Sequence, residues 1–382
     1  MKKTTKPKRP NIPIKTQLQL WVVSAGRCQF PGCNEFVLQD KTTLSEGNYA
    51  NIAHIISWTP TGPRGDAVLS PKLGKDVSNL MLMCLRHGKM VDIKKNIPTH
   101  TVDYLKKCKE DHENRIRIQT SIDASRKTTV VRLQTNIRGR RVAVPQPDVY
   151  TALITAGRYP YDEKGVHIDL TNLHYSADKS SWETATKQID AILNSALTVG
   201  NNERKEDHFS VFGIAPIPVL AYLGFKLGNT TPADVYIKLR EKPWSRVSSA
   251  PKLAFTLVRP RSKDKVKAVA LSIAISGTTS RTEIEKHLGK RALVYEIRLK
   301  KSQLDQIECI EDLEAFRKLY REAIDEIREV YGKKCRVHLF GAMPTCAAIV
   351  CGREIIHGVD PSIVIYEHLS QEEGFIPALT IN

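Results

Sequence analysis

Hydrophobic and polar positions divide the chain into two parts. From about residue 160 onward, short β-branched or apolar runs alternate with longer helical ones, which is the pattern of an α/β architecture. Before about residue 120, clustered Cys and His residues precede a charged helical run at 99–119. We therefore expect a first domain at 1–125, a linker and domain entrance at 126–159, and a second domain at 160–382.

The second part contains an internal repeat. Residues 208–239 and 336–367 each read as strand, Gly, Pro turn, apolar helix, Gly, Pro and strand, with Gly213 answered by Gly341 and Pro216 by Pro344. A duplicated βαβ-like unit explains this agreement, and two such units can pack about a pseudo-twofold axis. Ligands of open α/β sheets lie beyond the carboxyl ends of the strands, so the loops containing Pro216 and Pro344–Thr345 are expected to face one pocket.

Composition adds a preference for polyanions. The formal charge of +17 arises from 58 Lys and Arg against 41 Asp and Glu, which makes nucleic acid the leading partner. We expect no membrane span and no secretory signal, because no apolar window approaches about 20 residues and the basic N-terminus lacks an apolar region. The eight cysteines are then thiols or metal ligands in a reducing cytoplasm.

Four of the Cys and His residues have the spacing of a metal site. Cys28 and Cys33 form one pair, and Cys84 and His87 form a second pair after a long insertion. Two such pairs are how a tetrahedral zinc ion joins two ends of a small fold. The sequence predicts a structural Zn²⁺ site here, and the alternative is a set of buried thiols.

His54 lies within the apolar run "NIAHIISW", between the two pairs, and Asn79 follows 25 residues later. This order of cysteine pair, His strand, Asn and second pair resembles the HNH, or ββα-metal, endonucleases. The resemblance implies an α+β nuclease domain in which His54 is the general base and Asn79 orients it through its amide oxygen. It also implies one catalytic Mg²⁺ or Mn²⁺ and a double-stranded DNA substrate. Arg64, in a turn, is a candidate for a phosphate contact.

Two positions depart from the HNH pattern. Many family members carry Asp or His where this chain has Ala53, and His or Asn where it has Gly88. The ligands of the catalytic ion therefore stay open: His87 is one candidate, and Asp92 or Asp66 are candidates for the missing carboxylate. For either aspartate, a solvated charge or a turn former is the more ordinary role.

The second part resembles the SAVED domain, which consists of two fused CARF-like (Rossmann-like) units that bind cyclic oligonucleotides. The resemblance is carried by "VFGIAPIPVLAYLGFKLG", "REKPWSR" and residues 338–367. HNH joined to SAVED implies an effector nuclease of the cyclic-oligonucleotide-based anti-phage systems (CBASS). Its expected activator is a cyclic dinucleotide made by a partner nucleotidyltransferase.

Two further stretches are candidates for ligand contact. Trp244, between Lys242 and Arg246, offers a face for a base and cations for phosphate, although a Trp packed in the core is the alternative. The loop 277–280 runs from a strand into a helix, so its amides and hydroxyls suit a phosphate, with a simple N-cap as the alternative. The candidate residues in this loop are Gly277, Thr278 and Thr279.

The leading hypothesis is a DNA endonuclease that stays silent until a cyclic dinucleotide binds. A constitutive restriction-type HNH nuclease and a non-catalytic zinc-ribbon DNA-binding protein are the alternatives. Because one ββα-metal unit cuts one strand, we expect a homo-oligomer that becomes larger when ligand is bound.

Overall fold

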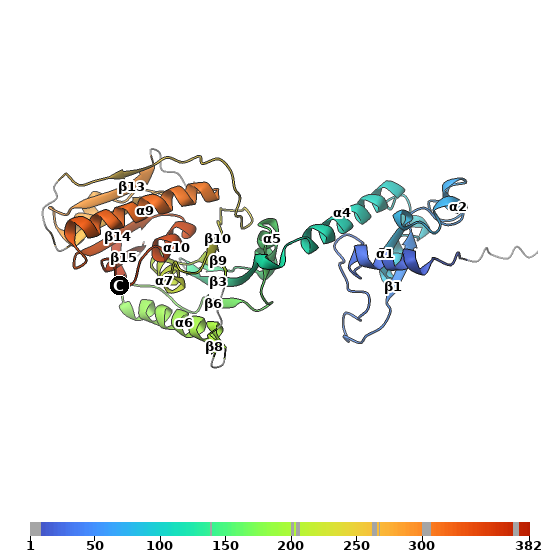
Figure 1. Ribbon diagram of the computed structural model, residues 1–382, viewed down its shortest axis with the longest axis horizontal. Coiled ribbons are helices and arrows are strands. Elements are labelled where there is room, and N and C mark those ends of the chain that lie inside the picture. The colour runs from blue at the N-terminus through green and yellow to red at the C-terminus, as the bar shows by residue number, and fades with distance from the viewer. Residues whose placement is uncertain are drawn as a thin grey trace, which may run out of the picture. The chain divides into compact units, whose positions relative to one another are not determined.

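The protein consists of two compact units, residues 1–122 and 123–382. Figure 1 traces the chain of this computed structural model and labels its elements. No helix in the described part of the chain has the length and apolar content needed to cross a membrane. The structure describes residues 9–137, 140–199, 202–203, 207–261, 266, 268–299, 307–369 and 374–382.

The first unit is built around a two-stranded antiparallel hairpin. Strand β1 pairs with β2 so that Ala50 lies opposite Cys84 and His54 lies opposite Leu80. Every residue of β2 is buried, and α3 follows it without a connecting residue. The elements of this unit are α1 (Ile14–Ser24), β1 (Ala50–His54), α2 (Leu69–Leu73), η1 (Val77–Asn79), β2 (Leu80–Cys84), α3 (Leu85–Met90), η2 (Lys94–Asn96) and α4 (Val102–Thr120).

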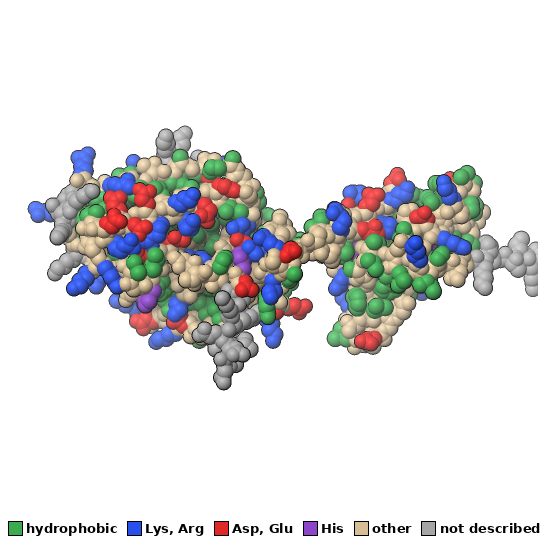
Figure 2. All heavy atoms as spheres, viewed as in Figure 1, with side chains coloured by type: hydrophobic (Ala, Val, Ile, Leu, Met, Phe, Trp, Pro, Cys, Tyr) green, Lys and Arg blue, Asp and Glu red, His purple; other side chains and the backbone are tan. Residues whose placement is uncertain are grey.

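Helix α1 has apolar side chains on two faces. Leu20 is fully buried in the core of the unit, whereas Ile14, Leu18 and Val22 are 76%, 60% and 74% exposed. These three residues recur every fourth position and so form one stripe along the helix. Figure 2 shows hydrophobic side chains gathered over α1. This stripe is turned to solvent in the single chain.

The first sheet of the second unit is centred on β3. Its strand order is β10-β9-β3-β4, and β5 and β6 also pair with β3. Residues 126–159 are therefore not a linker: they contain β3, whose apolar positions Val131 and Leu133 are fully buried. The elements of this half are η3 (Ala124–Arg126), β3 (Lys127–Ile137), β4 (Arg140–Val142), α5 (Gln146–Thr155), β5 (Tyr159–Pro160), β6 (Val166–Leu170), α6 (Lys179–Leu197), β7 (Thr198–Val199), β8 (Asn202–Glu203), β9 (Phe209–Ile214), α7 (Ile217–Leu227) and β10 (Ala233–Val235).

The second sheet has the order β11-β13-β12-β14-β15-β16, with a parallel centre and antiparallel edge strands β11 and β16. Helix α9 packs on β11 and β13. It buries Phe316, Tyr320 and Ile324 at the four-residue spacing of an amphipathic helix. The elements are β11 (Phe255–Val258), β12 (Ala268–Ala274), α8 (Arg281–Leu288), β13 (Val294–Leu299), α9 (Ile310–Tyr331), β14 (Arg336–Ala342), α10 (Thr345–Arg353), β15 (Ile363–Leu369) and β16 (Gly374–Ile381).

The predicted duplication is present as two parallel βαβ units, β9–α7–β10 and β14–α10–β15. Their helices pack directly on one another at two glycines. A Cβ at Gly224 would lie 2.1 Å from the carbonyl oxygen of Ile349, and one at Gly352 would lie 1.8 Å from that of Ala221. Each distance is far below a van der Waals contact, so the close approach of α7 and α10 requires glycine at both positions.

Candidate functional site

The two predicted Cys and His pairs come together in the first unit. Cys28 and Cys33 lie in the turn after α1, Cys84 ends β2, and His87 lies in the first turn of α3. One ligand atom from each residue lies within 4.8 Å of all the others. The Sγ atoms of Cys33 and Cys84 are 4.0 Å apart, and His87 Nδ1 is 3.3 Å from Cys84 Sγ and 3.7 Å from Cys28 Sγ.

These separations suit a tetrahedral metal. Zn–S bonds of about 2.3 Å and Zn–N bonds of about 2.0 Å place ligand atoms roughly 3.3–3.8 Å apart around one ion. Cys28, Cys84 and His87 are buried, and the ring of Phe30 stacks on that of His87 at 4.4 Å between centroids. A closed set of three sulfur atoms and one imidazole nitrogen is typical of structural zinc rather than of a catalytic ion with an open position.

His54 is the last residue of β1, and its side chain is largely buried. Its Nε2 lies 3.0 Å from the carbonyl oxygen of Gly74, which can only accept a hydrogen bond. Nε2 therefore carries the proton of the neutral ring, and Nδ1 keeps a free lone pair. Burial lowers the pKa of His54, with a further contribution from the charge of Arg9. The ring is thus a neutral base at neutral pH.

Asn79 does not orient His54 as the sequence predicted. Its Oδ1 accepts a hydrogen bond from the amide of Ile56 at 2.8 Å, and its Nδ2 donates to the carbonyl of Ile56 at 2.9 Å and to that of Leu73 at 3.3 Å. The side-chain amide of Asn79 is therefore engaged with backbone groups of Ile56 and Leu73. Asn79 fixes the chain beside His54, while Gly74 orients the imidazole.

We expect Asn79→Ala to lower the free energy of unfolding of the first unit by about 1–3 kcal/mol, because it leaves buried backbone groups of Ile56 unpaired. Any nuclease activity should fall less than with a substitution of His54. Thermal unfolding and single-turnover cleavage measure the two effects. Full loss of cleavage at unchanged stability would instead place Asn79 in the chemistry.

Arg64 supports the backbone instead of facing solvent. Its guanidinium donates to the carbonyls of Ile55 at 2.7 Å and Val91 at 2.8 Å and to the carboxylate of Asp92 at 2.6 Å. The side chain is only 3% exposed, so the predicted phosphate contact of Arg64 is wrong. Its buried cation joins the end of β1, which carries His54, to the segment after α3.

The two candidate carboxylates have different surroundings. The side chain of Asp92 is 45% exposed and lies close enough to His54 for its charge to oppose the lowering of that pKa. Asp66 accepts hydrogen bonds from the amides of Val68 at 2.8 Å and Leu69 at 2.7 Å, which is a turn-forming role. Asp92 is therefore the better candidate for a cation ligand beside His54.

Neither of the two residues that depart from the HNH pattern, Ala53 and Gly88, has a side chain that can bind a metal ion. Ala53 is buried in β1. A Cβ at Gly88 would lie 2.6 Å from the side chain of Asn51, so α3 packs too closely on β1 for a larger residue without a shift. His87 belongs to the Cys cluster, which leaves it unsuited to a separate catalytic ion.

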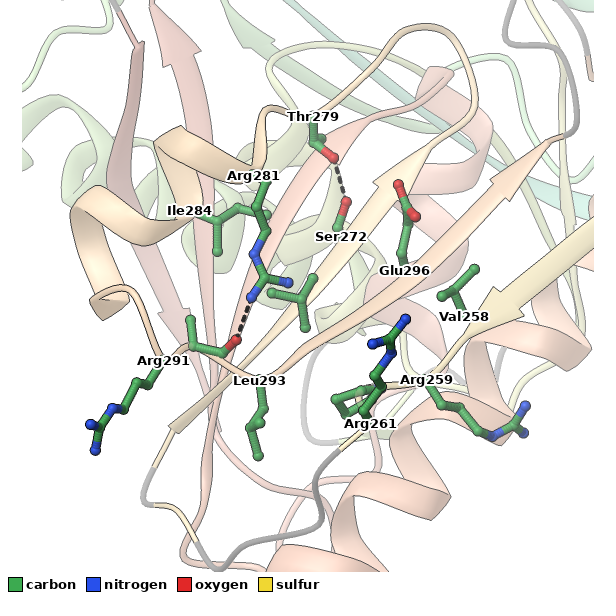
Figure 3. Close-up of a pocket in the computed structure, with 13 residues that line it drawn as sticks. Val258, Arg259, Arg261, Ser272, Thr279, Arg281, Ile284, Arg291, Leu293 and Glu296 are labelled. Carbon is green, nitrogen blue, oxygen red and sulfur yellow. Dashed lines mark hydrogen bonds between the residues drawn. The ribbon is translucent and has the colours of Figure 1, made fainter.

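The second unit contains a cavity of about 490 Å³ between α8 and the strands β11, β12 and β13 (Figure 3). Ile284, Leu293 and Val294 give it an apolar wall, and the hydroxyls of Ser272 and Thr279 hydrogen-bond to each other at one end. Charged side chains at the cavity are Arg259, Arg261, Arg281, Arg291 and Glu296. The excess of guanidinium groups favours an anionic ligand.

Residues 193–381 match the profile of the family described as "SMODS-associated and fused to various effectors sensor domain", or SAVED. This part of the chain is a SAVED domain. No curated protein matches the chain.

Solved structures similar to this chain include SAVED/CARF-domain receptors named Cap4. The Acinetobacter baumannii receptor with the cyclic trinucleotide 2'3'3'-cAAA shares 14% identity at a TM-score of 0.42, over 78% of this chain and 62% of that one. The Moraxella osloensis receptor shares 12% identity at a TM-score of 0.41, over 81% and 66%. The chain thus spans about three fifths of the length of the Acinetobacter structure.

Within the SAVED domain, Trp244 is not a stacking platform. It is 4% exposed and meets the ring of Phe212 edge-on at 5.3 Å. Arg246 pairs with Asp234 at 2.7 Å, and Lys242 pairs with Glu308 at 3.3 Å. Although burial opposes it, hydrogen bonding from His208 and the charge of Arg246 lower the pKa of Asp234 to about 2. Both flanking cations are therefore engaged in ion pairs, that of Lys242 at the surface, and the Trp is part of the core.

Only part of the predicted phosphate-binding loop, 277–280, lies at the cavity. Thr279 lines the cavity, whereas Gly277 and Thr278 are not among its lining residues. Helix α8 begins after Ser280, whose side chain makes no cap hydrogen bond, so the simple N-cap alternative is wrong for that side chain. Of this loop, Thr279 is the residue that the structure brings to a cavity.

The loops after β9 and β14 start helices. Pro216 and Pro344 are the N-cap residues of α7 and α10, and Thr345 is the first residue of α10. The amide of Ile217 donates to Glu367 at 3.0 Å, so a carboxylate already occupies the start of α7. The cavity between α8 and β11–β13 is lined by neither proline nor by Thr345.

The sequence analysis missed Arg261, Arg281 and Glu296. They lie after β11, on α8 and in β13, so no local motif joins them. The available signal was weak: the basic stretch "RPRSK" at 259–263 and a single acidic residue in the strand "VYEIRL".

Proposed function

We propose that this protein is a metal-dependent DNA endonuclease that is activated when its SAVED domain binds a cyclic oligonucleotide. The observation that carries the proposal is the gathering of Cys28, Cys33, Cys84 and His87 at the open end of the hairpin whose other end presents His54. A metal-fixed hairpin with a neutral, oriented histidine is suited to hydrolysing a phosphodiester.

In this proposal Cys28, Cys33, Cys84 and His87 hold a structural Zn²⁺. These residues would join the turn after α1 to the end of β2 and the start of α3 through the ion. Four protein ligands would leave no position open, so the ion would support folding and not the reaction.

His54 takes the proton of the attacking water at Nδ1, because Nε2 is engaged with Gly74. Arg64 holds the backbone of the histidine and the carboxylate of Asp92 in one network. A catalytic Mg²⁺ or Mn²⁺, when bound, neutralises the charge that develops on the phosphate. Asp92 is the residue best placed to hold that ion.

Charge favours double-stranded DNA as the substrate of the first unit. Residues 1–122 contain 20 Lys and Arg against 10 Asp and Glu, so this third of the chain carries most of the net charge of +17. Such a unit attracts the phosphate backbone irrespective of base sequence.

The activator is a cyclic dinucleotide supplied by a partner nucleotidyltransferase, as in the CBASS anti-phage systems. The family description of the SAVED domain as a sensor and the guanidinium-rich cavity support this ligand class. Ligand binding favours a conformation that pairs protomers, so that two hairpins meet opposite strands of one duplex. The active form is then a homo-oligomer larger than the ligand-free one.

Cleavage of supercoiled plasmid tests the proposal. The full-length protein with Mg²⁺ or Mn²⁺ is incubated with a panel of cyclic di- and trinucleotides, and light scattering follows its mass. Linearisation and fragmentation are expected only with a cognate cyclic nucleotide, together with a larger species. Activity without any cyclic nucleotide would identify a constitutive nuclease instead.

A non-catalytic zinc-ribbon DNA-binding protein is the second candidate. Ala53 and Gly88 favour it, since neither offers a ligand to a catalytic ion. That protein would shift DNA in a gel at low salt but leave it intact with every ligand and with both cations.

A further inference from the structure

The lining of the cavity between α8 and β11–β13 is apolar on one side and charged on the other (Figure 3). Its volume of about 490 Å³ falls in the range of small-molecule sites and accommodates one nucleotide. One wall is apolar, at Ile284 and Leu293, and the remaining lining carries charges. A flat base against the wall and a phosphate at the charges would fill both parts.

Two of the four arginines among the described lining residues turn their guanidinium groups into the cavity. In Figure 3, the guanidinium groups of Arg261 and Arg281 point toward the centre, whereas those of Arg259 and Arg291 point away. Arg281 is held by Glu285 at 2.9 Å and by the carbonyl of Ala292 at 2.9 Å. Arg261 has no hydrogen bond or ion pair within the residues described. Arg261 can therefore bind a phosphate through paired N–H donors, whereas Arg281, whose Nε and Nη2 are engaged, offers Nη1.

Among the residues that the structure describes, Glu296 is the carboxylate that lines the cavity. It extends from β13, and Figure 3 places its carboxylate on the side of the cavity opposite Arg281. Arg298 Nη1 lies 3.6 Å from Glu296 Oε2, which is longer than a hydrogen bond, so both oxygens keep acceptor sites. An ionised carboxylate only accepts hydrogen bonds and repels phosphate. The part of a nucleotide that meets Glu296 must therefore present hydrogen-bond donors: a ribose hydroxyl offers one, and a base edge offers N–H groups.

The bases differ in what they offer to such a group. Guanine presents two adjacent donors, N1–H and the N2 amino group, which match the two oxygens of a carboxylate. Adenine presents a donor beside an acceptor, the N6 amino group and N1, so a carboxylate satisfies one and opposes the other. Of the purines, guanine is the one that Glu296 selects.

We propose that this cavity binds a guanine nucleotide of the cyclic activator, with Glu296 reading the base and Arg261 and Arg281 holding a phosphate. The inference rests on the proposed function, since it assigns the base identity of the activator. It predicts that cyclic di-GMP or a mixed guanine–adenine ring binds more tightly than cyclic di-AMP.

Glu296→Gln tests the assignment, because an amide offers one acceptor and one donor and so matches adenine instead. Isothermal titration calorimetry of the full-length protein measures the Kd for cyclic di-GMP, cyclic GMP-AMP and cyclic di-AMP. The wild type should prefer a guanine-containing ring at least ~10-fold, and the variant should lose at least ~10-fold in that affinity ratio. Glu329→Gln, an exposed glutamate on α9, is the matched control and should leave the ratio unchanged.

The ratio of the Kd values for guanine and adenine ligands separates recognition of the base from a general effect of charge. Removing one negative charge near a phosphate site strengthens all three ligands together, whereas base reading shifts guanine and adenine ligands in opposite directions. Equal changes in all three Kd values, or a wild type that prefers cyclic di-AMP, would overturn the role of Glu296 while leaving the sensor intact. A wild type that binds no cyclic nucleotide of a broad panel overturns the proposed function itself.

Discussion

His54→Ala should reduce DNA cleavage at least ~100-fold, the usual effect of removing a general base, while folding and cyclic-nucleotide binding stay unchanged. The reason is local: in the proposed mechanism Nδ1 of this ring accepts the proton, because Nε2 is engaged with the carbonyl of Gly74. Cleavage is measured in single turnover with saturating ligand. The exposed His174 in the other unit provides the control substitution, His174→Ala, which should cut at the wild-type rate.

The pH profile gives a second readout of the same residue. Burial lowers the pKa of His54 below 6.5, so the base stays unprotonated to a more acidic pH than an ordinary histidine. The cleavage rate should hold as pH falls through 6.5 and decline only below it. A rate that already falls by half near pH 7, or normal cutting by His54→Ala, would remove His54 from the mechanism.

Cys28→Ser should abolish stoichiometric zinc and lower the Tm of the first unit by at least ~10 °C, because structural zinc contributes folding free energy directly. Cys28 is fully buried at the centre of the cluster, so a serine hydroxyl there is both a poor ligand and an unpaired polar group. Metal content by mass spectrometry and unfolding by calorimetry measure the two effects. The SAVED domain should keep its own transition and its ligand affinity.

Cys108→Ser is the matched control for that change. Cys108 is also buried in the first unit, on α4, but it lies outside the cluster. Its serine variant should retain one zinc per chain, and its loss of stability measures the cost of a buried hydroxyl without loss of the metal. Zinc retained equally by Cys28→Ser would show that Cys28 is not a ligand.

The features that could be predicted from the sequence are those determined by residues close together in the chain. Cys28 and Cys33 share one tight turn, and Cys84 and His87 span a strand end and a helix start, so each half of the cluster is local in the chain. The repeated strand, Gly, Pro and helix order likewise predicted two βαβ units, which the structure contains. In both cases residues near in sequence determine the local geometry.

The parts that sequence reasoning missed depend on long-range packing. Nothing local indicates that the carbonyl of Gly74, 20 residues away, meets His54, or that Asn79 turns its amide to Ile56. Flanking cations suggested an exposed Trp244, but Arg246 is bound by Asp234 in β10, and Lys242 is bound by Glu308, which is 66 residues away. The cavity of the SAVED domain is lined by α8 and by strands β11, β12 and β13, so no local sequence motif indicates it.

The crossing of α7 and α10 preserves the geometry of a two-chain assembly inside one chain. Gly224 rests on the carbonyl of Ile349, and Gly352, 128 residues after Gly224, rests on the carbonyl of Ala221, 128 residues before Ile349. Residue i of one copy meets residue j of the other, and j meets i, which is the reciprocity of an isologous homodimer. A free-standing ancestor with half this domain would have made the whole contact with a single glycine used twice, so gene fusion would have had only to join the chain ends of an interface that already existed.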